Sequence, residues 1–480
     1  MSFNFDNSYA TLPEHWFEKS KPTPLKDTHL ISFNAPLAQQ LGLNPCDWTP
    51  SKLVSAFTSE TLLEGLDPLA MKYTGHQFGV YNPDLGDGRG LLLGEHLSPD
   101  GLRWDLHLKG AGQTRYSRFA DGRAVLRSSI REFLVSEAMH GLGIPTTRAL
   151  AIFGSEQYTM RNGAEPCAMV LRVTPCHIRF GHFEYFYYSR QHDDLQLLAD
   201  YVIERYYPEF QQATNPYLAM YQEVVKRSAN LVALWQSYGF VHGVMNTDNM
   251  SIIGESFDYG PFTFMDRYEP DHIANKNDHQ GRYAFSNQPS MMQWNLAALA
   301  QSLLPLIPKE ELEKVLEGYA ELYFNAFYAQ MRARLALPGS GLEHRELIDQ
   351  FLNLLAELGG DLNRAIRLLV EEQPLGDAIG IQEGAADAFS DWLVRYQEAK
   401  QREPSSLNSR VETAKSKNPV YTLRNYMCQE AIRDAQDGDY RKVNDLLALV
   451  REPTKFSKSM AEYAGTPPDW AAGIMLTCSS

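Results

Sequence analysis

Three polar side chains in one short segment are suited to holding a metal ion and moving a proton. The segment begins His-Gly-Val-Met-Asn-Thr-Asp-Asn and ends Phe-Asp-Tyr-Gly. Asn249 stands seven residues after His242, and Asp258 stands nine residues after Asn249. Amide and carboxylate oxygens are hard ligands that suit Mg²⁺ bridging phosphate oxygens. Asp248, beside Asn249, can accept a proton.

The same spacing occurs in protein kinases, whose H-R-D-x-x-x-x-N and D-F-G motifs bring an Asn and an Asp to metal ions. The kinase base stands two residues after the His, and this chain has Val244 there. A valine cannot accept a proton, so the metal-binding pair is present and the usual base is absent. Asp248 is the candidate replacement. The alternative is a polar turn, because Asn-Thr-Asp-Asn is rich in turn-forming residues.

Residues upstream are suited to holding the phosphates of a nucleotide. Leu85-Gly86-Asp87-Gly88-Arg89-Gly90 is glycine-rich, which allows backbone N–H groups to approach phosphate oxygens. Lys109 follows on a predicted strand, where it can contact a phosphate and pair with a helix carboxylate. Glu132 is the first candidate for that carboxylate and Glu137 the second. A plain turn and solvated surface charges are the alternatives.

Two arginines seven residues apart, Arg172 and Arg179, are suited to terminal phosphates, because the guanidinium fork matches phosphate geometry. Structural ion pairs are an equally open reading. Four nearby histidines lack metal-ligand spacing and are interpreted as structural or surface residues: His177, His182, His272 and His279.

Alternating and helical patterns predict the elements that position these residues. Residues 86–109 predict strands, in which Trp104, Leu106 and Leu108 share one face and Lys109 lies on the other. A helix capped by Ser128 or Ser129 follows and ends near Gly141.

The rest of the chain is mostly helical. Residues 197–238 predict helix, and an apolar stripe over residues 347–358 predicts a buried helix face. The polar stretch from Lys400 to Lys417 predicts a linker. We therefore expect an α+β protein with a kinase-like bilobal fold, a nucleotide between the lobes, and added N- and C-terminal segments.

The predicted divisions have the following bounds: an N-terminal extension over 1–70; a β-rich N-lobe over 71–190 with the glycine-rich loop, Lys109 and the Glu132 helix; a helical C-lobe over 191–400 with a catalytic centre at 242–260; and a C-terminal helical segment over 401–480 with the Cys478 tail.

Composition narrows the class of protein. The 480 residues are 44% hydrophobic, which is enough for a full core, and the formal net charge is −15, which argues against a nucleic-acid partner. The first residues lack the basic start and apolar run of a signal peptide, and no apolar stretch reaches the ~20 residues of a membrane span. Five sparse cysteines fit reduced thiols. A cytoplasmic protein without a membrane partner is expected.

The chain resembles the selenoprotein O family along nearly its whole length. Matching stretches are specific and widely spaced: 73–80 (YTGHQFGV), 85–90 (LGDGRG), 108–112 (LKGAG), 121–127 (DGRAVLR), 129–134 (SIREFL), 180–184 (FGHFE), 242–251 (HGVMNTDNMS) and 257–261 (FDYGP).

The resemblance implies a kinase-like fold that binds ATP in a flipped orientation. It implies transfer of AMP to Ser, Thr or Tyr hydroxyls of proteins, the chain itself included, with release of pyrophosphate. UTP is implied as a second donor, particularly with Mn²⁺. The implied roles are a base at Asp248, metal ligands at Asn249 and Asp258, phosphate contacts from Lys109, Arg172 and Arg179, and a nucleotide site lined by Gly86, Gly88, Arg89, Asp121, Gly122 and Asp258.

Two rival functions use the same residues. A kinase would transfer the γ-phosphate, and a non-catalytic nucleotide-binding scaffold would keep Lys109 but need neither metal ligand. The resemblance also implies a redox role for Cys478 through a disulfide to the loop after Asp-Tyr-Gly. This chain has Ala274 in that loop and no cysteine between Cys176 and Cys428, so a mixed disulfide with glutathione or another protein is the form left open.

Overall fold

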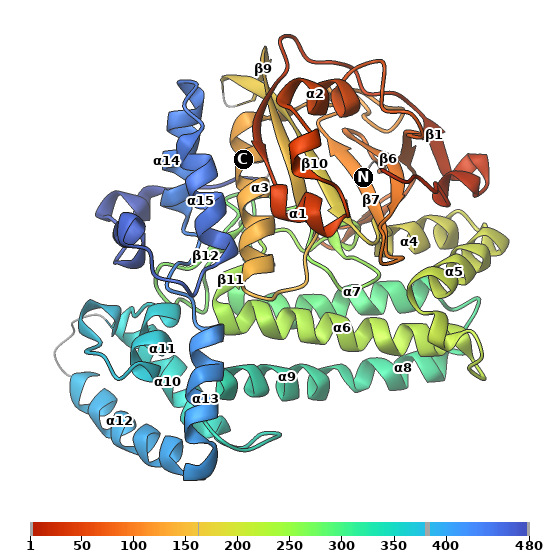
Figure 1. Cartoon of the computed structure of the whole chain (residues 1–480). Helices are drawn as coiled ribbons and strands as arrows, with labels where there is room; N and C mark the ends of the chain where they lie inside the picture. The colour runs from red at the N-terminus through yellow and green to blue at the C-terminus, as the bar shows by residue number, and fades with distance from the viewer. Residues whose placement is uncertain (1–2, 162, 380–384, 478–480) are drawn as a thin grey trace.

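An antiparallel sheet forms one side of the molecule and a layer of helices the other (Figure 1). The computed structural model describes residues 3–161, 163–379 and 385–477. The eight-stranded sheet has the order β1-β3-β6-β7-β10-β9-β2, with β8 paired to β10. Its strands are β1 Phe17–Lys19, β2 His29–Phe33, β3 Leu69–Met71, β6 Gly90–Leu97, β7 Arg103–Lys109, β8 Ala124–Val125, β9 Arg148–Met160 and β10 Ala164–Thr174.

Alternation along β7 separates the core from the site. Leu106 and Leu108 pack with α1 (Ala35–Gln40) and α2 (Pro50–Thr58) in a cluster on one face of the sheet. Lys109 points to the opposite face, as the period of two along a strand requires. The predicted strands and the predicted side of Lys109 are confirmed.

Helix α3 (Leu126–Gly141) packs on the sheet against β9 and β10. It begins two to three residues before the predicted cap, because the chain enters it directly from β8 at Val125, and no side chain caps it. The prediction of a cap at Ser128 or Ser129 is therefore wrong. Twelve of its sixteen residues are buried, so α3 is enclosed on nearly all sides.

The helical layer below the sheet contains α4–α13, with bounds α4 Phe180–Tyr188, α5 His192–Tyr206, α6 Pro216–Tyr238, α7 Gln288–Ser302, α8 Lys309–Glu317, α9 Tyr319–Arg334, α10 Arg345–Leu358, α11 Leu362–Val370, α12 Ala385–Gln401 and α13 Pro404–Lys417 (Figure 1). The apolar stripe predicted over 347–358 is the buried face of α10. Gly359 ends that helix in the left-handed region, at φ +64°.

The predicted linker at Lys400–Lys417 is wrong, since most of it is α13. Pro404 occupies the first helical turn, where a missing N–H costs nothing. The helix is polar because it lies at the surface, where Ala414 is its only fully buried residue among those described.

Two last helices return to the sheet side of the molecule. α14 (Asn425–Gln436) and α15 (Arg441–Arg451) pack on α3, on the side away from the sheet (Figure 1). Near the end of the described residues, Leu476 forms a parallel bridge with Asn275. The predicted α+β class is confirmed. None of the described helices has the length and apolar character that crossing a membrane requires.

Candidate active site

A cavity of about 720 Å³ lies where the sheet meets the helical layer, a volume typical of small-ligand sites. Residues singled out in the sequence come from widely separated parts of the chain to line it: Gly86, Gly88, Arg89, Lys109, Asp121, Gly122, Glu132, Arg172, Arg179, Asp248, Asn249 and Asp258. Cys478 lies outside the described residues.

A short two-stranded ladder holds the central segment in place. β11 (Phe240–Val241) pairs with β12 (Thr263–Phe264), so the chain between them forms a closed loop. Inside the loop, buried His242 lies with Nε2 3.2 Å from the carbonyl oxygen of Phe257. This contact ties the two halves of the loop, which carry the predicted base and metal ligands.

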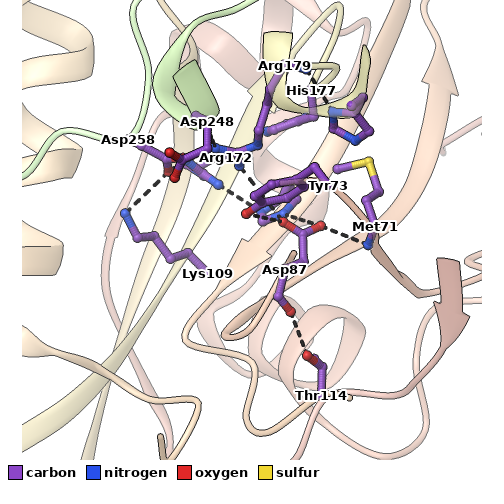
Figure 2. Close-up of polar contacts among 12 residues, drawn as sticks. Met71, Tyr73, Asp87, Lys109, Thr114, Arg172, His177, Arg179, Asp248 and Asp258 are labelled. Carbon is purple, nitrogen blue, oxygen red and sulfur yellow. Dashed lines mark hydrogen bonds and ion pairs between the residues drawn. The ribbon is translucent and has the colours of Figure 1, made fainter. Parts of the chain in front are cut away.

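Asp258 lies in a buried cluster of charges (Figure 2). Arg172 Nη1 donates to its Oδ1 at 2.6 Å, Arg179 Nη1 donates to Oδ2, and Lys109 Nζ lies 3.6 Å from Oδ1. Burial raises the pKa of this carboxyl, but the three cations outweigh burial and hold the pKa well below its usual range. Its φ of +56° is rare outside glycine, and such backbone clusters at functional sites.

Lys109 forms an ion pair with Glu132 of α3. Burial lowers the pKa of Lys109, opposed by the charges of Glu132 and Asp258. The second candidate partner, Glu137, faces away from the cavity, where Arg148 binds it with both guanidinium arms at 2.6 and 2.8 Å. The structure therefore selects Glu132 over Glu137.

Aromatic and histidine side chains fix the two arginines, each of which is 2% exposed. The Arg179 guanidinium lies 4.7 Å from the ring centre of Tyr73 and 4.6 Å from that of Phe257. Arg172 Nη2 donates to Nδ1 of His107 at 3.1 Å. Burial lowers the pKa of His107, so the ring is neutral and its Nδ1 can accept this bond.

Asp248, the predicted base, lies in the 3₁₀ turn η5 (Thr247–Asn249) at the cavity wall. Burial raises its pKa to about 7, opposed by Arg179 and reinforced by Asp258. Gln77 Nε2 lies 3.3 Å from Oδ2, and Oδ1 is buried without a hydrogen-bond partner among the described residues. A carboxyl at the cavity wall with a pKa near neutrality suits proton transfer.

Hydrogen bonds from the 114–117 turn hold the glycine-rich loop in place. Thr114 Oγ1 donates to the carbonyl oxygen of Asp87 at 2.7 Å, and Ser117 Oγ donates to that of Gly88 (Figure 2 shows the Thr114 bond). Gly86 has φ +146°, and a Cβ there would lie 2.6 Å from Tyr116. Only glycine fits beneath this turn.

Hydrogen bonds from two neighbouring side chains hold Asp121 in place. Arg161 Nη2 donates to its Oδ1 at 2.7 Å, and Thr159 Oγ1 donates to Oδ2. Burial raises the pKa of Asp121, but the bonds from Arg161 and Thr159 outweigh it and lower the pKa below its usual value. Asp121 and Gly122 therefore shape the rim of the cavity.

The donor set fits a metal that arrives with phosphates. Among the residues that the structure describes, no three His, Cys, Asp or Glu side chains gather to hold a metal by themselves. Asn249 Nδ2 donates to the carbonyl oxygen of Val244 at 3.0 Å, which leaves its amide oxygen free for another partner. Asn249 and Asp258 supply two hard oxygens, as Mg²⁺ needs when phosphate and water complete its shell.

Several residues at the site carried no assigned role in the sequence. Tyr73 and Gln77 belong to motif stretches, but no local periodicity says that they meet the centre more than a hundred residues away. Asn246 lies in the centre itself, and its contact with the distant Phe78 amide is likewise not visible in the local sequence. His107 carries a signal that could have been used, since the alternation that aims Lys109 at the cavity aims His107 there too.

Comparison with known proteins agrees with this geometry. The profile of a family described as "Protein adenylyltransferase SelO" matches residues 1–451. The chain belongs to the SelO family. The predicted family and the predicted enzyme class, a protein nucleotidyltransferase, are thereby confirmed.

Similar SelO-family relatives carry the printed name "Protein nucleotidyltransferase YdiU". The chain is 57% identical to that of Hahella chejuensis over 484 aligned positions, with 100% of this chain and 98% of the relative covered. It is 47% identical to that of Chromohalobacter salexigens over 485 positions, with 100% and 98% covered. It is 46% identical to that of Vibrio vulnificus strain YJ016 over 486 positions, with 100% and 99% covered.

Proposed function

We propose that this SelO-family chain transfers AMP from ATP to Ser, Thr or Tyr hydroxyls of proteins, with ATP bound in a flipped orientation in a kinase-like two-lobed fold. The observation that carries the proposal is the pair of fully buried arginines, Arg172 and Arg179, beside the metal-type carboxylate of Asp258. In the kinase pattern this position has no assigned arginines. In a flipped pose they bind the β- and γ-phosphates.

The chain's own residues then have the following roles. Lys109, held by Glu132, and the two arginines neutralise the phosphates. The acceptor oxygen attacks the α-phosphorus, the bond from that phosphorus to the bridging oxygen breaks, and pyrophosphate leaves. Asp248 takes the proton of the acceptor hydroxyl. Most of the rate acceleration comes from positioning and charge neutralisation, as in phosphoryl transfer.

Asn249 and Asp258 would hold the Mg²⁺ or Mn²⁺. Bound there, the metal supplies charge neutralisation at the reacting phosphate. We extend the proposal to UTP as a second donor, since in this pose the charge cluster would contact the phosphates and not the base.

Labelled nucleotides separate this function from its two rivals. With Mg²⁺ or Mn²⁺ and a protein acceptor, ATP labelled on the α-phosphate should mark protein, and ATP labelled on the γ-phosphate should not. Arg172→Ala and Arg179→Ala should each reduce the α-label, while Arg441→Ala, an exposed arginine far from the cavity, should not. A γ-label would support a kinase, and no label with any metal, nucleotide or acceptor would support a scaffold.

A further inference from the structure

A small hairpin covers the segment that carries Asp248. Its strands are β4 (Gly75–Gln77) and β5 (Val80–Asn82), which pair with each other and not with the main sheet. The backbone N–H of His76 donates to Thr247 Oγ1 at 2.7 Å, and that of Phe78 donates to Asn246 Oδ1 at 3.2 Å. The backbone of the hairpin therefore donates hydrogen bonds to the side chains of the two residues that directly precede Asp248.

The hairpin approaches the turn more closely than a side chain at position 75 would ordinarily allow. A Cβ at Gly75 would lie 3.0 Å from Asp248 Cβ and from Thr247 Oγ1, and 3.1 Å from the Asp248 nitrogen. These distances are shorter than ordinary van der Waals contacts, so Gly75 lets the backbone rest directly on the turn.

The opposite side of β4 anchors the hairpin to the helical layer. Nδ1 of His76 lies 2.8 Å from Oε2 of Glu184, a fully buried residue of α4. Its ring packs against Trp294 and Tyr81, with ring centres 5.3 Å away in both cases. Because successive side chains of a strand point to opposite sides, this anchor on His76 directs Gln77 toward Asp248.

A chain of side-chain hydrogen bonds ends at one oxygen of the base. Asn82 Nδ2 donates to Gln77 Oε1 at 3.1 Å, which leaves Gln77 Nε2 facing Asp248 Oδ2 at 3.3 Å. The other oxygen, Oδ1, is buried and has no hydrogen-bond partner among the described residues. One oxygen is thus held from the hairpin, which fixes the orientation of the whole carboxylate at the cavity wall.

We propose that Gln77, braced by Asn82, is a positioning residue that holds the Asp248 carboxylate in the orientation in which it takes the acceptor proton. The proposal rests on the proposed function, because it assigns Asp248 the part of the base. Gln77 affects the reaction only through Asp248, and the hairpin fixes the orientation of the Asp248 carboxylate.

Kinetics of Gln77→Leu test the proposal. Leucine keeps the size of the side chain and removes both hydrogen-bonding groups. Since a hydrogen bond to a charged group contributes ~1.5–3 kcal/mol, kcat for α-label transfer should fall about ten- to a hundredfold, with KM for ATP unchanged. Asn82→Ala should give a smaller fall of the same kind. Val80→Ala, an exposed position on the same hairpin, should match wild type.

A double-mutant cycle with Asp248→Ala separates positioning from a general structural role. In that background Gln77→Leu should change the residual rate less than about twofold, because the group it positions is gone. Equal losses in both backgrounds, or a rise in KM alone, would overturn the proposal.

The same double-mutant cycle can be measured on the free energy of unfolding in urea, which requires no enzymatic activity. A coupling between Gln77 and Asp248 in the folded protein supports the contact, and additive effects of the two substitutions contradict it. If wild type transfers no label, the proposed function fails and this cycle still decides whether Gln77 holds Asp248.

Discussion

At the residue scale, the displaced base has a titration suited to its task. Burial raises the pKa of Asp248 to about 7, whereas Val244, at the kinase base position, has no proton to exchange. Asp248 must be ionised to accept a proton, and its raised pKa means that it is protonated at acidic pH.

We expect kcat/KM to rise with pH through a midpoint near 7 and to level off above it, because this constant reports the free enzyme. Asp248→Asn should lose this acidic limb and turn over ~10²–10⁴-fold more slowly. Steady-state transfer of the α-label from about pH 5.5 to 8.5 measures both. A flat wild-type profile over that range would rule out Asp248 as the titrating base.

At this scale the sequence predicts the site residues that share a motif, but it does not predict contacts between residues far apart in the chain. The offsets among His242, Asn249 and Asp258 identified one wall of the cavity without any structure. The sequence did not predict where the hairpin lies, since the contact of Gln77 with Asp248 spans 171 positions. No spacing rule connects residues so far apart.

At the element scale, the two glutamates of α3 lie on different sides of the helix. Five residues at 100° each turn Glu137 about 140° from Glu132. Glu132 therefore meets the cavity, and Glu137 meets Arg148 of β9 and Arg451 of α15. Sequence could name both glutamates but could not orient the helix, because α3 is buried nearly all round and offers no polar face.

Breaking the pair of Glu137 and Arg148 should be costly. Glu137→Ala leaves a buried guanidinium without its partner, so the free energy of unfolding should fall by about 3–5 kcal/mol. Glu137→Met with Arg148→Met should recover much of the loss. Urea denaturation measures both. Glu223→Ala, which breaks two partly exposed pairs within α6, should cost about 1 kcal/mol or less. Equal costs at both sites would contradict the argument.

The C-terminal region shows where composition misleads. A polar stretch with a proline predicted a linker, and the structure has helix α13 there, because Pro404 sits in a first turn and a surface helix needs few apolar residues. The predicted apolar stripe of α10 was reliable, since it has a buried face to pack.

At the scale of the whole molecule, the tail holds a loop of the cavity. The Lys276 amide donates to the Leu476 carbonyl oxygen at 2.8 Å, and Asn277 lines the cavity. This bridge joins the tail to the loop through main-chain groups at Leu476.

Deleting residues 474–480 should speed hydrogen exchange at the Lys276 amide, because its acceptor is removed. Exchange at Val170, in the middle of the sheet, should be unchanged and serves as the control. Mass spectrometry of peptides covering both positions measures the effect. Unchanged protection at Lys276 would show that the bridge does not hold the loop in solution.

The enclosure of α3 affects how catalysis begins once the enzyme meets its substrates. In protein kinases, movement of the helix that carries the lysine's partner controls activity. Here that helix is held by the sheet on one side and by α14 and α15 on the other, with Arg131 bonded to Asn425 at 3.1 Å. Progress curves should therefore run without a lag from the moment of mixing. The amount of enzyme and the supply of acceptor, rather than a switch in this helix, would set the rate in a cell.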